Sequence, residues 1–222
     1  MEIGQSKAKA VWKRSDLIAI LIIGELVAWL AFAILQNARN DLFFYPGLLK
    51  FFGSALNIGL LMALFVPLAA LACLYAAYLL GQKMPVIFQV AKFISVGVLN
   101  TLIDWGILTI QVIMTGINAG LGYGIFKSVS FSAAVFNSFI WNKCWTFKKN
   151  DTGKTQQELL QFLLLSLVGF CINVGVASFV VDVVGPQGGI SRNLWATVGG
   201  AAATMFSMVW DFVVYKFIVF KK

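Results

Sequence analysis

Five polar side chains that could form a belt within the membrane lie deep inside long apolar runs: Asn100, Asp104, Asn137, Asn173 and Asp211. Asp104 follows Phe93, where its run begins, by about 16 Å along a helix. In a hydrocarbon core about 30 Å thick, that position is near the middle. A carboxylate there costs about 2.5–3.5 kcal/mol on insertion scales, so we expect it to face the bundle interior, with a polar partner or along a path for a substrate or protons. For the Asn residues, an interhelical hydrogen-bond network is the alternative.

The cations near the ends of the same runs are of the kind that binds phosphate. Lys127 and Arg192 lie near one predicted membrane boundary, and Lys92, Lys143 and Lys216 lie near the other. A phosphate binds well to Lys or Arg in a dry pocket. The alternative is that these side chains only extend to the headgroup level. Two phosphate sites joined by a belt of polar groups would suit an amphiphile that crosses the membrane.

The acidic residue of the first apolar run, Glu25, has two interpretations. It faces the same polar belt, or it docks the first pair of helices to the rest of the chain. The sequence does not decide between them.

Residues needed for most enzyme chemistry are missing. The 222 residues contain no histidine, which removes the usual general base and proton relay. The segment "DTGKT", Asp151–Thr155, resembles the end of a phosphate-binding loop, but Lys148 stands where the first glycine belongs. Three cysteines, Cys73, Cys144 and Cys171, show no metal-binding spacing, and we expect them to pack between helices. The sequence therefore predicts a protein that is not an enzyme and has no cofactor or metal.

The amino-acid composition is that of an integral membrane protein. The chain is 60% hydrophobic and 12% charged, with a mean hydropathy of +0.87, whereas a soluble domain has about 25% charged residues. Six runs are long enough to span a bilayer, which takes about 20 apolar residues. They are residues 17–35, 51–80, 93–114, 119–147, 159–184 and 194–220. The predicted fold is an all-α polytopic membrane protein with six transmembrane helices and short links.

The distribution of the cations predicts the orientation. With the N-terminus in the cytoplasm and six crossings, only Arg39, Lys50, Lys127 and Arg192 fall on the outer side. The other thirteen of the 17 Lys and Arg residues (17 − 4) fall on the cytoplasmic side. The positive-inside rule then places both termini in the cytoplasm. The net charge of +8 is explained by contact with anionic lipids, so no nucleic-acid partner is needed.

Helices three and four resemble helices five and six. "KFISVGVLNTLIDWG" at 92–106 aligns with "QFLLLSLVGFCINVG" at 161–175 at an offset of 69, and "NKCWTFKK" at 142–149 aligns with "YKFIVFKK" at 215–222 at an offset of 73. Asp104 then corresponds to Asn173, and Lys143 corresponds to Lys216. The two hairpins cross the membrane in the same sense, which predicts a parallel internal repeat with binding groups at its interface. Duplication in a purely structural protein is the alternative.

Two motifs resemble those of the GtrA-like family of small membrane proteins. They are "KFISVGVLNTLIDWGIL" and "FKSVSFSAAVFNSFIWNKCWTF", and the likeness covers about residues 89–222. The residues that match the family pattern are Phe93, Val96, Gly97, Asn100, Thr101, Asp104, Lys127, Ser128, Asn142, Lys143, Trp145, Thr146 and Phe147. The resemblance implies a four-helix GtrA-like domain at 89–222, preceded by a two-helix membrane extension at 1–88.

The resemblance also implies a function. Members are proposed to move polyprenyl-phosphate-linked monosaccharides from the cytoplasmic to the outer leaflet for cell-surface polysaccharide glycosylation. Their partners are the lipid-linked sugar or polyprenyl phosphate, membrane lipids and a polyprenyl-phosphate glycosyltransferase. A homo-oligomer would enclose a larger cavity than six helices can. The candidate substrate-binding residues are Asn100, Asp104, Lys127, Asn137, Asn142, Lys143, Asn173, Arg192, Asp211 and Lys216.

Two other functions stay open at this point. An ion-coupled exporter of small molecules would depend on one buried carboxylate and on pH. A membrane scaffold that recruits a glycosyltransferase through its first two helices would not depend on the intramembrane polar groups.

Overall fold

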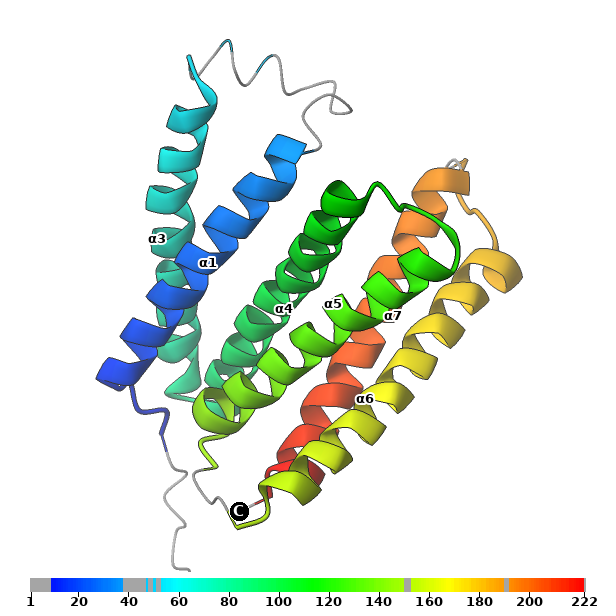
Figure 1. Cartoon of the computed structure of the whole chain (residues 1–222). Coiled ribbons are helices and arrows are strands. Elements are labelled where there is room, and N and C mark those ends of the chain that lie inside the picture. The colour runs from blue at the N-terminus through cyan, green and yellow to red at the C-terminus, as the bar shows by residue number, and fades with distance from the viewer. Residues whose placement is uncertain are drawn as a thin grey trace, which may run out of the picture. The chain divides into compact units, whose positions relative to one another are not determined.

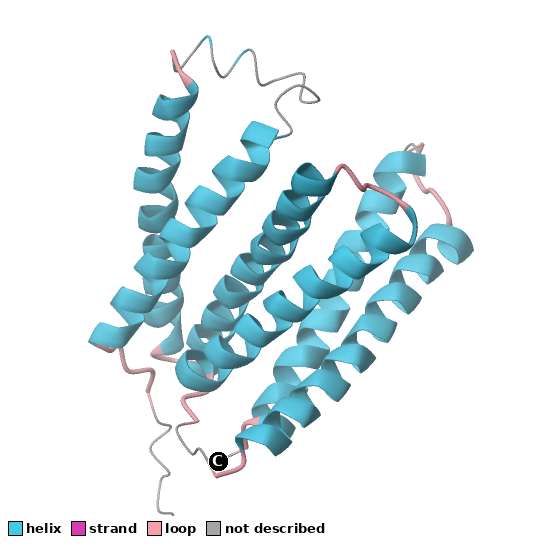
Figure 2. Ribbon diagram, viewed as in Figure 1, coloured by secondary structure: helices cyan, strands magenta, loops and turns pink. Residues whose placement is uncertain are grey.

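The structure is a computed structural model that describes residues 9–37, 47, 50, 53–149, 153–189 and 192–221. Helices make up the regular structure, and no strand occurs among these residues (Figures 1 and 2). The chain forms two compact units, Met1–Thr146 and Phe147–Lys222. Arg39 lies outside the described residues, as does the side chain of Arg192.

The first unit contains four long helices and a short π-helix. They are α1 (Arg14–Asn37), α3 (Ala55–Gly81), α4 (Pro85–Thr115), α5 (Gly120–Trp141) and η1 (Asn142–Thr146). The Ser54 side chain caps α3 by accepting a hydrogen bond from the backbone N–H of Asn57 at 3.1 Å. Proline begins α4, where its missing N–H costs no hydrogen bond, and Gly116 ends it with a left-handed φ of 71°.

The second unit is a helical hairpin with a π-helical segment at the end of each arm. Its elements are α6 (Thr155–Ser178), η2 (Phe179–Val184), α7 (Arg192–Val214) and η3 (Tyr215–Val219). The prediction of an all-α polytopic membrane protein is confirmed.

Five helical segments are long and apolar enough to cross a membrane: Arg14–Gln36, Ala55–Gly81, Pro85–Thr115, Thr155–Val184 and Val198–Val219. The remaining predicted span, residues 119–147, corresponds to α5 and η1. α5 carries Lys127 and four serines within 22 residues, which lowers its hydropathy. It packs along α4, whose apolar surface it partly covers.

The core of the first unit joins the two extension helices to α4. Its buried members include Ile20 and Ile23 from α1, Leu74 from α3, and Val96 and Leu99 from α4. This shared core is why 1–146 forms one compact unit. The predicted boundary between 88 and 89 stays a prediction. The three cysteines are exposed, so the expectation that they pack between helices is wrong for the described part of the chain.

The α1–α3 contact depends on the absence of a side chain at Gly24. A Cβ placed there would lie 2.5 Å from the Cα of Pro67 in α3. The contact atom belongs to the backbone of α3, so no flexible side chain can move aside to make room.

We therefore expect Gly24→Ala to lower the thermal midpoint of the detergent-solubilised protein, because α1 and α3 must move apart. The matched control is Gly97→Ala in α4, where a Cβ meets nothing within 4 Å. There, alanine should be neutral or stabilising by up to about 1 kcal/mol because Gly is the poorer helix former. Equal midpoints for the two variants would contradict the close contact.

The two hairpins share local features at the predicted offset of 73. Each ends in a π-helix, at Asn142–Thr146 and at Tyr215–Val219. The Lys143 Nζ lies 5.8 Å from the Phe139 ring centroid, and the Lys216 Nζ lies 5.4 Å from that of Phe212. These correspondences agree with the internal repeat.

Candidate functional site: polar groups inside the α4–α5 hairpin

A partly exposed charge pair links α4 to α5. The Lys127 ammonium pairs with Asp104 Oδ2, and the Ser130 hydroxyl donates to Asp104 Oδ1 at 2.6 Å. Lys127 and Ser130 are three residues apart and share one face of α5. The Asp104 side chain is 15% exposed and that of Lys127 is 43% exposed. The pair is therefore closed on the carboxylate side and open on the ammonium side.

A second polar contact lies one helical turn away along α4. The Asn137 side-chain N–H donates to the Asn100 side-chain oxygen at 2.6 Å. Each amide has both a donor and an acceptor group, so the pair keeps the capacity to bond a sugar hydroxyl. We call the set Asn100, Asp104, Lys127, Ser130 and Asn137 the polar track. The sequence placed Asn100, Asp104 and Asn137 at depth and Lys127 near a membrane boundary, and the structure joins these four in two pairs.

The start of η1 is more enclosed than the sequence suggested. Asn142 is 1% exposed and donates from its side chain to Ser138 Oγ at 3.2 Å. Its side-chain oxygen is buried and has no hydrogen-bond partner among the described residues. Lys143 is also buried, with its ammonium near the Phe139 ring.

The second hairpin carries amide and carboxylate groups in a different arrangement. The Asn173 side-chain N–H donates to Ser207 Oγ at 3.1 Å. Asp211 lies against Gly169, where an added Cβ would be 2.4 Å from its Oδ1. At the repeat offsets, Asn173 replaces Asp104 and Gly200 replaces Lys127. The repeat therefore does not reproduce the charge pair of the first hairpin.

Of the two predicted cations of the second unit, Lys216 and Arg192, the structure describes the side chain of Lys216. The Lys216 ammonium lies 5.4 Å from the Phe212 ring centroid and 5.5 Å from that of Phe217. Arg192 is the first residue of α7, but its side chain is not among the described ones.

A buried ion pair lies at the N-terminal end of α1. The sequence did not predict it. The Lys92 Nζ is 2.5 Å from Asp16 Oδ1, and the Trp145 indole N–H donates to the same oxygen at 3.0 Å. The other Asp16 oxygen accepts the backbone N–H of Lys13 at 2.9 Å. Asp16 is 0% exposed and Lys92 is 2% exposed. The expectation that Lys92 binds phosphate or extends to the headgroups is therefore wrong, because the ammonium is enclosed.

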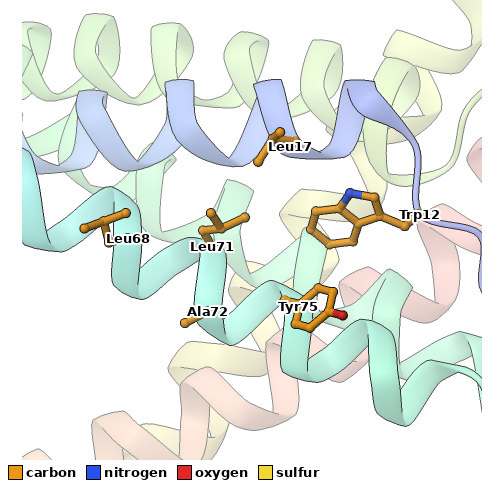
Figure 3. A pocket seen from close by; sticks show the side chains of 6 residues that line it. All are labelled: Trp12, Leu17, Leu68, Leu71, Ala72 and Tyr75. Carbon is orange, nitrogen blue, oxygen red and sulfur yellow. The ribbon is translucent and has the colours of Figure 1, made fainter.

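A hollow of about 410 Å³ opens between α1 and α3 (Figure 3). Its lining consists of Trp12, Leu17, Leu68, Leu71, Ala72 and Tyr75. The Trp12 and Tyr75 rings meet edge to face at 5.7 Å. The lining of this hollow is almost wholly apolar, so it is unsuited to a charged or strongly polar ligand.

The C-terminal part of the chain matches a known family of transmembrane domains. The model "GtrA/DPMS, transmembrane domain" matches residues 92–220, more than half of the chain. The chain belongs to this family. The GtrA/DPMS match begins at Lys92 and includes all ten predicted site residues, so the resemblance identified from the sequence is confirmed.

Two curated proteins are similar to parts of this GtrA/DPMS protein. "Uncharacterized membrane protein YngA" of Bacillus subtilis (strain 168) is 30% identical over 113 residues, which are 46% of this chain and 71% of that protein. "Dolichol-phosphate mannosyltransferase" of Pyrococcus furiosus is 31% identical over 85 residues, which are 38% of this chain and 23% of that protein. No solved structure matches the chain.

The buried ion pair joins α1 to the segment that matches the GtrA/DPMS family. Lys92 and Trp145 lie within the family match, whereas Asp16 lies before it. Trp145 belongs to the "NKCWTF" part of the second family motif. Here its indole binds the aspartate of the extension. A sequence signal did exist, since Asp16 is an acidic residue in the first turn of α1, but nothing local indicated its partner.

Proposed function

We propose that this GtrA/DPMS protein moves a polyprenyl-phosphate-linked monosaccharide from the cytoplasmic to the outer leaflet, for glycosylation of a cell-surface polysaccharide. The observation that supports it is the polar track inside a membrane domain of this family. A sugar and a phosphodiester must cross about 30 Å of hydrocarbon, while the polyprenyl tail can stay in lipid. A lysine with an open side suits the phosphate, and paired amides suit the sugar.

Each predicted site residue has a role in this proposal. Lys143 and Lys216 receive the phosphate on the cytoplasmic side, and Lys127 and Arg192 receive it on the outer side. Asp104 holds Lys127 until the phosphate replaces the carboxylate. The amide and carboxylate groups along the sugar path are those of Asn100, Asn137, Asn142, Asn173 and Asp211.

The setting follows from the same proposal. The protein lies in the inner membrane with both termini in the cytoplasm, and the domain at 89–222 carries the transport path. It performs no chemistry of its own. One glycosyltransferase supplies the lipid-linked sugar and another uses it outside. The name of the pyrococcal relative, a dolichol-phosphate mannosyltransferase, supports a connection with polyprenyl-phosphate sugars.

The test is transport in reconstituted vesicles. A polyprenyl-phosphate-linked sugar is placed in the inner leaflet, and its exposure outside is followed with an enzyme that cannot cross the membrane. We expect the wild-type protein to accelerate exposure over protein-free vesicles, and Lys127→Ala to abolish most of the acceleration. Ser128→Ala is the matched control, because Ser128 is the exposed neighbour whose hydroxyl, among the described residues, bonds within α5 to the Gly124 carbonyl.

Two results would contradict the proposal. Exposure no faster than in protein-free vesicles would reject the function. Wild-type rates in the folded Lys127→Ala variant would reject the site. Proton-driven transport of a small soluble cation, with no effect of polyprenyl lipids, would favour the exporter instead.

A further inference from the structure

Glu25 lies near the middle of α1 and points away from the core of the first unit. The buried face of α1 is formed by other positions: Asp16, Ala19, Ile20, Ile23, Gly24 and Ala28. Glu25 is exposed and makes no hydrogen bond or ion pair in the described part of the chain. It therefore does not dock α1 onto α3, and it is not bonded to the polar track.

The residues around Glu25 form a continuous outward stripe. Ser15, Ile18, Ile22, Glu25 and Trp29 are all exposed and follow one another at intervals of three, four, three and four residues. We call this stripe the α1 seam. Alternating three- and four-residue steps produce the left-handed helix pairing that is common between membrane helices. Ile22 and Trp29, which flank the carboxyl, are 46% and 45% exposed.

A carboxyl in this position needs a protein partner. Glu25 lies about 16 Å from the start of α1 at Arg14, measured along the helix axis. That distance puts it near the centre of the hydrocarbon core. Lipid chains offer it no hydrogen bond, and its short side chain cannot reach the headgroups.

We propose that the α1 seam binds the α1 seam of a second copy of this chain, with the two Glu25 carboxyls hydrogen-bonded across the interface. Copies inserted in the same orientation and related by a twofold axis along the membrane normal have Glu25 at the same depth. An interface of this kind is self-complementary. A protonated carboxyl donates and an ionised one accepts, so two Glu25 side chains that share a proton satisfy each other. No cation from a different protein is required, and the pairing does not depend on which substrate is transported.

Cysteine crosslinking in native membranes tests the geometry. In full-length protein with Cys73, Cys144 and Cys171 replaced by alanine, Ile22→Cys supplies a single thiol in the α1 seam. Leu64→Cys supplies one on α3 at a residue of similar exposure, 55%. With one thiol per chain, any disulfide between two copies runs as a dimer. We expect rapid dimer formation for Ile22→Cys and little for Leu64→Cys.

Substitution of Glu25 tests the chemistry, with energy transfer between labelled copies measured as lipid is added. Glu25→Gln should keep the dimer, because an amide also donates and accepts. Glu25→Leu should lower the association constant about threefold to thirtyfold, the range that follows from measured interhelical hydrogen bonds. Leucine on an exposed membrane face is expected to leave the monomer folded, which thermal unfolding checks.

Several outcomes would overturn the proposal. They are equal crosslinking of the two thiols, unchanged association of Glu25→Leu, or capture of Ile22→Cys by a different membrane protein in place of a second copy. None of these outcomes bears on transport in vesicles, so the proposed function can stand or fall separately.

Discussion

Replacing Lys92 with alanine is expected to lower the free energy of unfolding of the first unit by about 3–5 kcal/mol, the usual cost of removing one partner of a buried ion pair. The reason is the enclosure of Asp16, which is 0% exposed and would lose its cation. Asp16→Ala should cost a similar amount, because it leaves the Lys92 ammonium enclosed. The measurement is the thermal midpoint of purified protein in detergent, determined from the loss of the monodisperse species on heating.

Three further variants make this expectation specific. Lys83→Ala is the matched control, because Lys83 is an exposed lysine in the link between α3 and α4. The double variant Asp16→Leu with Lys92→Met should recover most of the stability, since apolar residues of similar size can replace a buried pair at little cost. Trp145→Phe keeps an aromatic ring but removes the indole donor, so it should cost about 1.5–3 kcal/mol. A Lys92→Ala midpoint equal to that of Lys83→Ala would contradict the enclosed pair.

The ion pair was not predictable because its members are distant in sequence and ordinary locally. A lysine near the end of an apolar run normally extends to the headgroups, and an acidic residue in the first turn of a helix normally interacts with the helix dipole. The partners are 76 residues apart. Only the packing of α1 against α4 brings them together, and hydropathy contains no information about which faces of two helices meet.

The apolar runs, which follow from hydropathy, and the repeat offset, which follows from local sequence matches, were predicted well. The run predicted at 93–114 lies within α4, and the run at 17–35 lies within α1. The offset of 73 between the hairpin ends holds for the π-helices and for Lys143 and Lys216. The π-helices themselves were not expected, because a shift from the four-residue to the five-residue hydrogen bond follows from packing and not from composition.

For the site as well, the sequence predicted how deep the residues lie better than it predicted which side chains contact one another. Asn100 and Asp104 are four residues apart, a spacing that puts both on one face of a helix, and both do face α5. The sequence assigned Lys127 to the outer boundary as a phosphate contact, without a partner. The structure pairs Lys127 with Asp104. Side-chain reach explains the difference, because a long lysine can bond a carboxylate well below the level of its own Cα.

This pairing predicts opposite effects of two substitutions on the binding of polyprenyl phosphate. If the lipid phosphate replaces Asp104 at the Lys127 ammonium, Lys127→Gln should weaken binding about tenfold to a hundredfold, the contribution expected of a charge-assisted hydrogen bond. Asp104→Asn removes the competing carboxylate. It should tighten binding about twofold to fivefold, because a partly exposed pair contributes at most about 1 kcal/mol. The same variant should slow net transport, since the phosphate then leaves Lys127 less readily.

Dissociation constants for polyprenyl phosphate without a sugar, measured in nanodiscs, separate this exchange from a structural role of the pair. Ser128→Ala again serves as the control and should bind as the wild type does. A structural role predicts a different pattern, in which Asp104→Asn and Lys127→Gln weaken binding equally because each leaves its partner unpaired and loosens the α4–α5 contact. Opposite signs from the two halves of one ion pair can arise only when the lysine, and not the pair, is what the phosphate binds.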